Sequence, residues 1–337
     1  MKLKFFCGQT DESFMKESPS PLKIIDLVVK YNDFTAVKGL NLELKTSEVF
    51  GLLGPNGAGK TSTIACLVNL ENSFSGQMKI FDHDLKTDLL AAKKLLGYVP
   101  QEAVNHGFFS VLEIMSFHSG YYGLNKNQDY ILYLLERLGL TEHKQKKVKQ
   151  LSGGMKRRLM IAKALVHKPK LLLLDEPTAG VDIQLRSSLW DFVRELKNDG
   201  VTILLTTHYL EEAEALCDRI GILHQGELLK LGHTKSLIKD LTQRFLKIEF
   251  NKPLGSNQML SQITNQTTKQ MTNQILNHKF LFESKDNTFT FKLPSNTKIG
   301  DILRDLGEHV AEIEDVHLIE GNLEDAFKII LNQKTSS

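Results

Sequence analysis

The stretch GPNGAGKT, residues 54–61, follows the apolar run VFGLL and precedes a segment with helical character. It matches G-x-x-x-x-G-K-[ST], the pattern of a loop that binds phosphate between a strand and a helix. Its glycines let main-chain N–H groups close around phosphate oxygens, and the positive end of the following helix faces the same anion. Such a match arises by chance in roughly one chain of this length in a hundred. The loop therefore predicts a nucleotide site.

Two side chains of this loop have expected chemical roles. The Lys60 ammonium suits the β and γ phosphates, and the Thr61 hydroxyl suits Mg²⁺. The residues expected to contact the nucleotide are Gly54, Pro55, Asn56, Gly57, Ala58, Gly59, Lys60, Thr61 and Ser62.

Around the loop, the first 245 residues alternate strand-like and helix-like segments, which is typical of an α/β fold with a parallel or mixed sheet. The runs KLLLLD (170–175) and VTILLTTH (201–208) are continuously apolar, as in strands that are covered on both faces. LLAAKKLLG predicts a helix closed by Gly97. IGILHQGELLKLG predicts a hairpin that turns at Gln225 and Gly226.

The composition changes near residue 240, and we divide the chain there. We expect a polar lead-in at 1–20, a nucleotide-binding domain at 21–240 with a helical part at about 102–167, and a small α+β domain at 245–337. In the small domain, the strand-like segments RFLKIEF, KFLFES and NTFTFKL surround a polar insert at 256–278. Two helices are expected after them, at 299–306 and 323–331, the second with Asn322 as its N-cap.

Composition and charge exclude some functions. The chain has 42 Lys and Arg against 40 Asp and Glu, a net charge of +2, so its bulk charge gives no support to nucleic-acid binding. No apolar run approaches the roughly 18 residues of a membrane span, and the N-terminus lacks the pattern of a signal peptide. Cys7, Cys66 and Cys217 are widely spaced. We expect buried or idle thiols in a reducing compartment, the cytosol.

Four polar residues follow predicted strands. Asp175 and Glu176 end one apolar run, where one carboxylate can hold Mg²⁺ and the next can orient an attacking water. His208 ends the following run, and Gln101 follows GYVP. Taken singly, an acidic pair here is more often a helix N-cap, and the His and Gln are more often structural or solvated. The phosphate loop upstream favours the functional interpretation of the acidic pair.

Together these segments resemble an ATP-binding cassette (ABC) ATPase subunit. The family's motifs occur in order over residues 22–235: Walker A at 54–61, the Q-loop Gln101, the signature LSGGM at 151–155, Walker B at 171–175 followed by Glu176, the D-loop AGVD ending at Asp182, and the switch His208. Tyr31 stands where the family has an aromatic residue that stacks on adenine. The resemblance implies a RecA-like α/β core with an antiparallel β subdomain and a helical signature subdomain.

The resemblance also implies a mechanism that uses ATP and Mg²⁺. Two cassettes of the family close head to tail around two ATP molecules, so each site combines the Walker loop of one with the signature of the other. Ser152, Gly153 and Gly154 would then bind the γ-phosphate held by a second cassette, which we expect to be an identical copy in a homodimer. The other implied roles are metal contacts for Thr61, Gln101 and Asp175, water polarisation for Glu176, a γ-phosphate contact for His208, and coupling of the two sites for Asp182.

Because no membrane segment is evident, the resemblance points to the energy subunit of a transporter whose permease is encoded separately, at the cytoplasmic face of the plasma membrane. The aromatic-rich segment 105–124 would receive the membrane partner. The ending LEDAF (323–327) resembles the LEDVF helix of export-type cassettes, which favours export over an importer cassette. A soluble ABC protein acting on ribosomes or nucleic acid is the main alternative.

The three basic residues after the signature are Lys156, Arg157 and Arg158. We expect them to form the solvated face of an amphipathic helix over about 152–167 rather than a phosphate or nucleic-acid patch.

Overall fold

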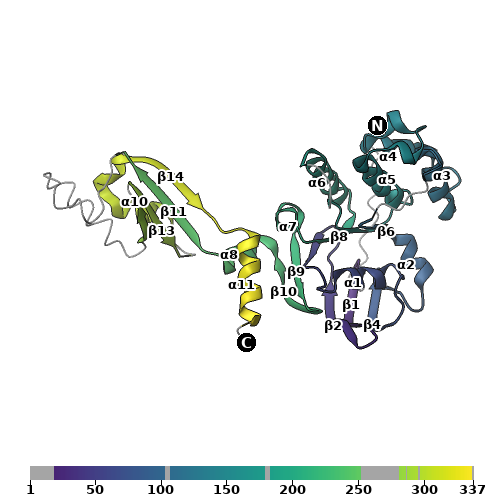
Figure 1. Ribbon diagram of the computed structural model, residues 1–337, viewed down its shortest axis with the longest axis horizontal. Helices are drawn as coiled ribbons and strands as arrows, with labels where there is room; N and C mark the ends of the chain where they lie inside the picture. The colour runs from purple at the N-terminus through teal and green to yellow at the C-terminus, as the bar shows by residue number, and fades with distance from the viewer. Residues whose placement is uncertain are drawn as a thin grey trace, which may run out of the picture.

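The computed structural model describes residues 19–102, 107–178, 183–251, 281–285, 287–294 and 297–335. Its central element is a six-stranded sheet with the order β10-β9-β3-β8-β7-β6, in which only the β9–β10 pair is antiparallel (Figure 1). The strands are β3 (Val49–Leu53), β6 (Leu96–Val99), β7 (Leu171–Asp175), β8 (Thr202–Thr207), β9 (Arg219–His224) and β10 (Glu227–His233).

The buried strands of this sheet supply two hydrophobic cores. In β7, Leu172 and Leu174 belong to the core formed with the helical half of the molecule, whereas Leu171 and Leu173 belong to the core formed with the antiparallel sheet. Because side chains alternate between the faces of a strand, a strand covered on both faces is apolar at every position. The predicted strands KLLLLD and VTILLTT are confirmed for this reason.

An antiparallel sheet with the order β2-β1-β4-β5 covers one face of the central sheet. Its strands are β1 (Lys23–Tyr31), β2 (Phe34–Glu43), β4 (Phe74–Ile80) and β5 (His83–Asp84), and α1 (Lys60–Leu67) and α2 (Leu89–Leu95) contribute to the same core. The other core is built from α3 (Val111–Tyr121), α4 (Gln128–Arg137), α5 (Gly153–Leu165), α6 (Ile183–Asn198), α7 (Leu210–Leu216) and α8 (Thr234–Leu241). The expected α/β core, antiparallel subdomain and helical subdomain are therefore all present.

The end of α2 differs from the prediction, whereas the turn between β9 and β10 agrees with it. Gly97 does not close the helix before it, because α2 ends at Leu95 and Gly97 lies inside β6. A Cβ atom at Gly97 would stand 2.6 Å from the carbonyl oxygen of Ala164, so glycine here allows the backbone of α5 to approach the strand. The predicted hairpin turn is confirmed: Gln225 and Gly226 both have positive φ between β9 and β10.

A third, antiparallel sheet follows, with the order β12-β13-β11-β14. Its strands are β11 (Arg244–Phe250), β12 (Leu281–Lys285), β13 (Thr288–Leu293) and β14 (Ile313–Ile319), and α10 (Ile299–Leu306) packs on it. The segments predicted as β11, β12 and β13 are strands, and β14 was not predicted. The polar insert at 256–278 lies outside the described residues.

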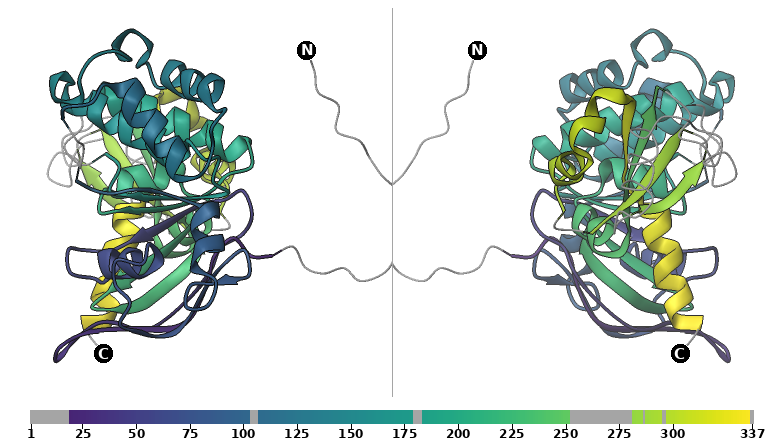
Figure 2. Two further views of the ribbon diagram at one scale, coloured as in Figure 1. Left: turned by 90° about the vertical axis from the view of Figure 1, so that its right-hand side faces the viewer. Right: turned by 90° about the vertical axis from the view of Figure 1, so that its left-hand side faces the viewer.

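The last helix, α11 (Leu323–Thr335), leaves this sheet and packs against the nucleotide-binding part of the chain. Leu323 and Ile330 join the core shared with α7 and α8. The Leu323 N–H donates to the Glu214 carboxylate at 2.8 Å. Asn322 caps the helix as predicted, since its side-chain oxygen accepts from the Asp325 N–H at 3.0 Å. In both views of Figure 2, α11 runs away from the small sheet.

Candidate nucleotide-binding site

Four parallel strands of the central sheet end at the same edge and place the predicted motifs there. The phosphate loop follows β3, and Gln101 follows β6. Asp175 ends β7 with Glu176 directly after it, and His208 follows β8. Ligand sites of open α/β sheets form at the carboxyl ends of the strands. The topology therefore brings together residues that are separated by more than a hundred positions in the chain.

The shape of the phosphate loop requires glycine at two positions. Gly54 and Gly59 have φ of +159° and +107°, and a Cβ atom there would lie 2.2 Å from the carbonyl oxygen of Leu223 and 2.5 Å from that of Ala36. Gly59 precedes α1, whose first turn has no side-chain cap and no acidic residue. The helix start therefore offers main-chain N–H groups and a positive dipole end to an anion.

The Lys60 side chain reaches back to the first residues of the phosphate loop. Its ammonium donates to the carbonyl oxygens of Gly54 at 2.6 Å and Pro55 at 3.0 Å, and the residue is 5% exposed. Burial lowers the pKa of the Lys60 ammonium, while the carboxylates of Glu176 and Asp175 oppose that shift. The ammonium is thus held at the phosphate loop by main-chain carbonyl groups, close enough to two carboxylates to feel their charge.

Asp175 is buried at the end of β7. Its carboxylate accepts a short hydrogen bond from the Thr206 hydroxyl of the neighbouring strand. Burial raises the pKa of the Asp175 carboxyl, and the Thr206 hydrogen bond and the charge of Lys60 oppose the shift. The Asp175 carboxylate and the Thr61 hydroxyl are the kinds of oxygen ligand that Mg²⁺ prefers.

Glu176 is the residue at which the predicted catalytic side chains meet. The Gln101 amide donates to the Glu176 carboxylate at 2.8 Å, and His208 Nδ1 lies 3.1 Å from its other oxygen. Glu176 has a φ of +45°, in the left-handed region that residues other than glycine rarely adopt. Its N–H donates to the carbonyl oxygen of Thr206 at 3.0 Å, which helps to hold this conformation.

A cleft of 400 Å³ lies over the loop. It is lined by Tyr31, Phe34, Ala36, Asn56, Gly57, Ala58, Gly59, Lys60, Thr61, Ser62, Gln101 and Glu176. The sequence prediction included Tyr31 but not Phe34, which pairs with it across the β1–β2 hairpin and is 64% exposed. Two aromatic rings at the rim provide a stacking surface for a planar base. The spacing of a tight hairpin, Y-N-D-F, was the signal that could have identified Phe34.

The signature residues lie elsewhere. Ser152, Gly153 and Gly154 form the start of α5 and are not among the residues that line the cleft. The Ser152 hydroxyl accepts from the Met155 N–H at 3.3 Å and caps the helix, and space is open beside Gly153. Asp182 lies outside the described residues.

The expectation of a solvated basic face after the signature is wrong for Arg157. This residue is 5% exposed, because its guanidinium is surrounded by the ends of β6 and β7. Lys156 and Arg158 are half-buried, and Arg158 donates to the carbonyl oxygen of Leu138 at 3.1 Å.

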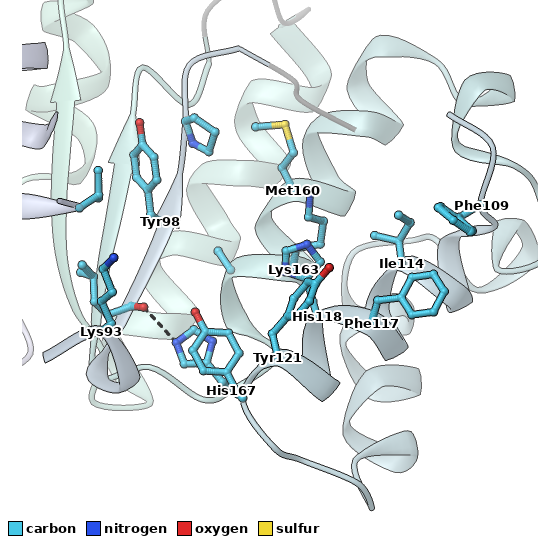
Figure 3. Close-up of a pocket in the computed structure, with 15 residues that line it drawn as sticks. Lys93, Tyr98, Phe109, Ile114, Phe117, His118, Tyr121, Met160, Lys163 and His167 are labelled. Atoms are coloured by element: carbon cyan, nitrogen blue, oxygen red, sulfur yellow. Dashed lines mark hydrogen bonds between the residues drawn. The ribbon is translucent and has the colours of Figure 1, made fainter. Parts of the chain in front are cut away.

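A second hollow lies between α2, β6 and the helical subdomain, with a volume of 720 Å³. Figure 3 shows Phe109, Ile114 and Phe117 on one side of it, Lys93 and Tyr98 on the other, and Met160 and Lys163 between them. Tyr122 stacks on His167 with ring centroids 3.7 Å apart. Several aromatic side chains at this end of the molecule are exposed, with Phe108 at 79% and Tyr121 at 80%.

The strand–loop–helix cradle and the acidic residues at the end of β7 define a P-loop nucleoside triphosphatase. A family model described as ABC transporter matches residues 37–179. The linearmycin resistance ATP-binding protein LnrL of Bacillus subtilis (strain 168) is 42% identical over 213 residues, 63% of this chain and 68% of that protein. The Nod factor export ATP-binding protein I of Burkholderia orbicola (strain AU 1054) is 39% identical over 224 residues, 66% of this chain and 74% of that protein.

Solved structures agree with these relatives. The structure of an ATP-binding subunit of an ABC transporter matches with a TM-score of 0.61 and 27% identity, over 66% of this chain and 93% of that one. CbiO1 of Clostridium perfringens, described as part of the ABC transporter complex cbiONQ, matches with a TM-score of 0.58 and 30% identity, over 65% of this chain and 90% of that one. The chain belongs to the ABC transporter family and is an ATP-binding ATPase of that family. Within the described residues, no helix combines the length and apolar character needed to cross a bilayer.

Proposed function

We propose that this protein is the energy subunit of an exporter, which dimerises head to tail around two ATP molecules and drives a separately encoded permease at the cytoplasmic face of the plasma membrane. The observation that carries the hydrolytic part is the contact of Gln101 and His208 with opposite oxygens of Glu176. This arrangement orients a carboxylate at the end of β7, beside the phosphate loop.

The residue roles follow from their positions. The main chain at 54–61 and the Lys60 ammonium bind the phosphates, and Tyr31 with Phe34 stacks on the base. Glu176 polarises the attacking water, Gln101 orients that carboxylate and senses the metal, and His208 contacts the γ-phosphate. Asp182 lies outside the described residues, and we assign it the coupling of the two sites of the dimer from its place in the D-loop motif AGVD.

Mg²⁺ is the metal that fits the oxygen donors present. Thr61, Asp175 and Gln101 are the residues that would hold it, beside the phosphates of the nucleotide. The described residues contain no group of three or more His, Cys, Asp or Glu side chains that could hold an ion alone. A hard cation held by one carboxylate, one hydroxyl and phosphate oxygens is the usual Mg²⁺ arrangement at a nucleotide site.

The position of the signature supports a dimer. A helix start with a hydroxyl and two glycines suits an anion, yet Ser152, Gly153 and Gly154 do not line the cleft of their own chain. A second, identical cassette turned head to tail would bring its phosphate loop to this helix start. Each chain then completes the site of the other.

The hollow between α2 and the helical subdomain supports a permease partner. It is lined by aromatic and aliphatic side chains with Lys93 and Lys163 among them, and exposed apolar surface of this kind is typical of interaction sites. We propose that a short cytoplasmic segment of the permease docks here. The names of the relatives, resistance and export ATP-binding proteins, favour the export direction over an importer.

The replacement Glu176→Gln tests the hydrolytic site. Glutamine keeps the size of the side chain but cannot polarise water as a carboxylate does, so ATP turnover should fall at least about a hundredfold. ATP binding should remain, and size-exclusion chromatography with ATP should show a stable dimer. The matched control is Glu211→Gln, at a glutamate whose side chain is 85% exposed. Unchanged turnover in Glu176→Gln would refute its assigned role.

The replacement Tyr121→Glu tests the docking surface. A charge on this 80% exposed ring at the hollow should shift the protein from the membrane fraction to the supernatant of native cells, while purified protein keeps its ATPase rate. Tyr133→Glu, at a 47% exposed tyrosine on α4 outside the hollow, is the control. Copurification from cells distinguishes this proposal from the alternative of a soluble ABC protein. Ribosomes or nucleic acid among the copurified partners, in place of membrane protein, would favour that alternative. We expect no nucleic-acid partner.

A further inference from the structure

Arg157 is a buried arginine that lies just beyond the signature motif. It sits in the second turn of α5, inside the molecule, where 5% of its surface is exposed. Removing a charge from water is costly unless hydrogen bonds and opposite charge replace the lost hydration. Burial lowers the pKa of the Arg157 guanidinium, and the Asp175 and Glu212 carboxylates oppose that shift.

Hydrogen bonds to five main-chain carbonyl oxygens satisfy this guanidinium. Nε donates to Pro177 at 2.8 Å; Nη1 donates to Pro100 at 2.6 Å and Gln101 at 2.9 Å; Nη2 donates to Asp175 at 3.1 Å and Glu176 at 2.9 Å. An arginine has five N–H donors in a rigid planar fork, so its donor capacity is fully used. A lysine has three donors on a point charge and cannot reproduce this arrangement.

The five carbonyl groups belong to two segments that carry the hydrolytic side chains. Residues 100–101 follow β6 and carry the Gln101 amide, and residues 175–177, the last residue of β7 and the two after it, carry the Glu176 carboxylate. These two side chains are hydrogen-bonded to each other at 2.8 Å. The Arg157 guanidinium therefore joins, through the main chain, the two segments whose side chains are hydrogen-bonded to each other.

The main chain at Glu176 depends on such support. Its left-handed φ of +45° is unfavourable in a residue other than glycine, and persists only where the surroundings over-determine it. The Glu176 N–H is held by the carbonyl oxygen of Thr206 at 3.0 Å, and the Glu176 carbonyl oxygen by Arg157 at 2.9 Å. Arg157 thus contacts both peptide groups that flank the strained residue, through the carbonyl oxygens of Asp175 and Glu176.

We propose that Arg157 is a positioning residue for ATP hydrolysis, which holds the Gln101 amide against the Glu176 carboxylate by fixing the main chain at 100–101 and 175–177. The inference rests on the proposed function, because it explains the geometry of the group assigned there as the water-polarising residue. Arg157 acts only through these carbonyl groups. Because α5 begins at the signature, the same contact links the signature helix to the hydrolytic pair.

The conservative variant Arg157→Lys tests this role. It keeps the charge but loses the fork, so kcat should fall about a hundredfold, the usual effect of misplacing a reacting group by about 1 Å. KM and the affinity for a fluorescent ATP analogue should stay within about threefold. Arg157→Gln should behave in the same way. Arg137→Gln, at an arginine whose contact is an exposed ion pair with Glu195, should keep the kcat of the unmodified protein.

A double variant separates positioning from general stability. If Arg157 acts through Glu176, Arg157→Lys should cause little further loss of turnover when it is added to Glu176→Gln, because effects within one unit are not additive. Full kcat in Arg157→Lys, or losses that multiply in the double variant, would overturn the proposal. So would loss of folding and nucleotide affinity together with turnover in both single variants. Absence of turnover in the unmodified protein would contradict the proposed function instead.

Discussion

At the end of β7, a carboxyl group is buried beside a buried ammonium, and both lose hydration on folding. Asp175 is 4% exposed and Lys60 is 5% exposed. Burial raises the pKa of the Asp175 carboxyl and lowers that of the Lys60 ammonium, so each shift disfavours the charged form. The proposed site, which would use both charges for phosphate and metal, therefore loses some folding stability, as is common where function requires buried polar groups.

This cost predicts that Asp175→Asn stabilises the protein in the absence of nucleotide and metal. Asparagine keeps the shape and an oxygen for the Thr206 hydroxyl without a buried charge. We expect the melting temperature to rise by about 2–4 °C, the shift that roughly 1 kcal/mol produces in a domain of 150–250 residues. Mg²⁺ with ATP should then stabilise the variant less than the unmodified protein. A lower melting temperature in the variant without ligand would contradict the argument.

The difference in stability between the unmodified protein and Asp175→Asn should change with pH in a definite direction. Because the pKa of Asp175 is raised in the folded protein, the folded state binds more protons than the unfolded chain between the ordinary and the raised pKa. The stability of the unmodified protein relative to Asp175→Asn therefore falls as the pH rises through the raised value. Thermal melts from neutral toward acidic pH should show the two melting temperatures converging.

Among the elements, strands covered on both faces were the most predictable from sequence, and residues whose burial depends on distant segments were the least. The apolar run Leu171–Leu174 predicts β7 correctly because each of its side chains packs into one of the two hydrophobic cores. Arg157 looked solvated because its partners are carbonyl groups at the ends of β6 and β7, which no helical periodicity reveals. β14 was missed because an edge strand with six exposed residues has no apolar alternation to detect.

The packing of α11 predicts which of its residues stabilise the chain. Leu323 is fully buried in the core shared with α7 and α8, so Leu323→Ala should cost about 2–5 kcal/mol. Leu318→Ala, at a 39% exposed leucine on β14, should change stability by less than about 0.5 kcal/mol. Urea unfolding followed by circular dichroism measures both. Equal effects would mean that α11 is not docked through Leu323.

At the scale of the whole molecule, the chain enters and leaves the small sheet at neighbouring points. It has its own core, formed by residues such as Phe250, Phe289 and Ile302. Its entry and exit strands are paired, with Phe245 opposite Ile319. Arg244 also lies 3.5 Å from the Glu320 carboxylate. Figure 1 shows the sheet at the end of the molecule opposite the helices α3, α4 and α5.

This geometry predicts that the small sheet can be removed from the chain while α11 is kept. Replacing residues 245–319 by a short Gly-Ser linker joins two points that are already adjacent, so loop closure costs little and α11 can still pack on the core it shares with α7 and α8. We expect the shortened protein to fold cooperatively, bind ATP and hydrolyse it at a rate within about threefold of the full chain. The matched control ends the chain at residue 320, which removes α11 and should lower the melting temperature sharply. A shortened protein that fails to fold would show that the nucleotide-binding part needs the small sheet for its stability.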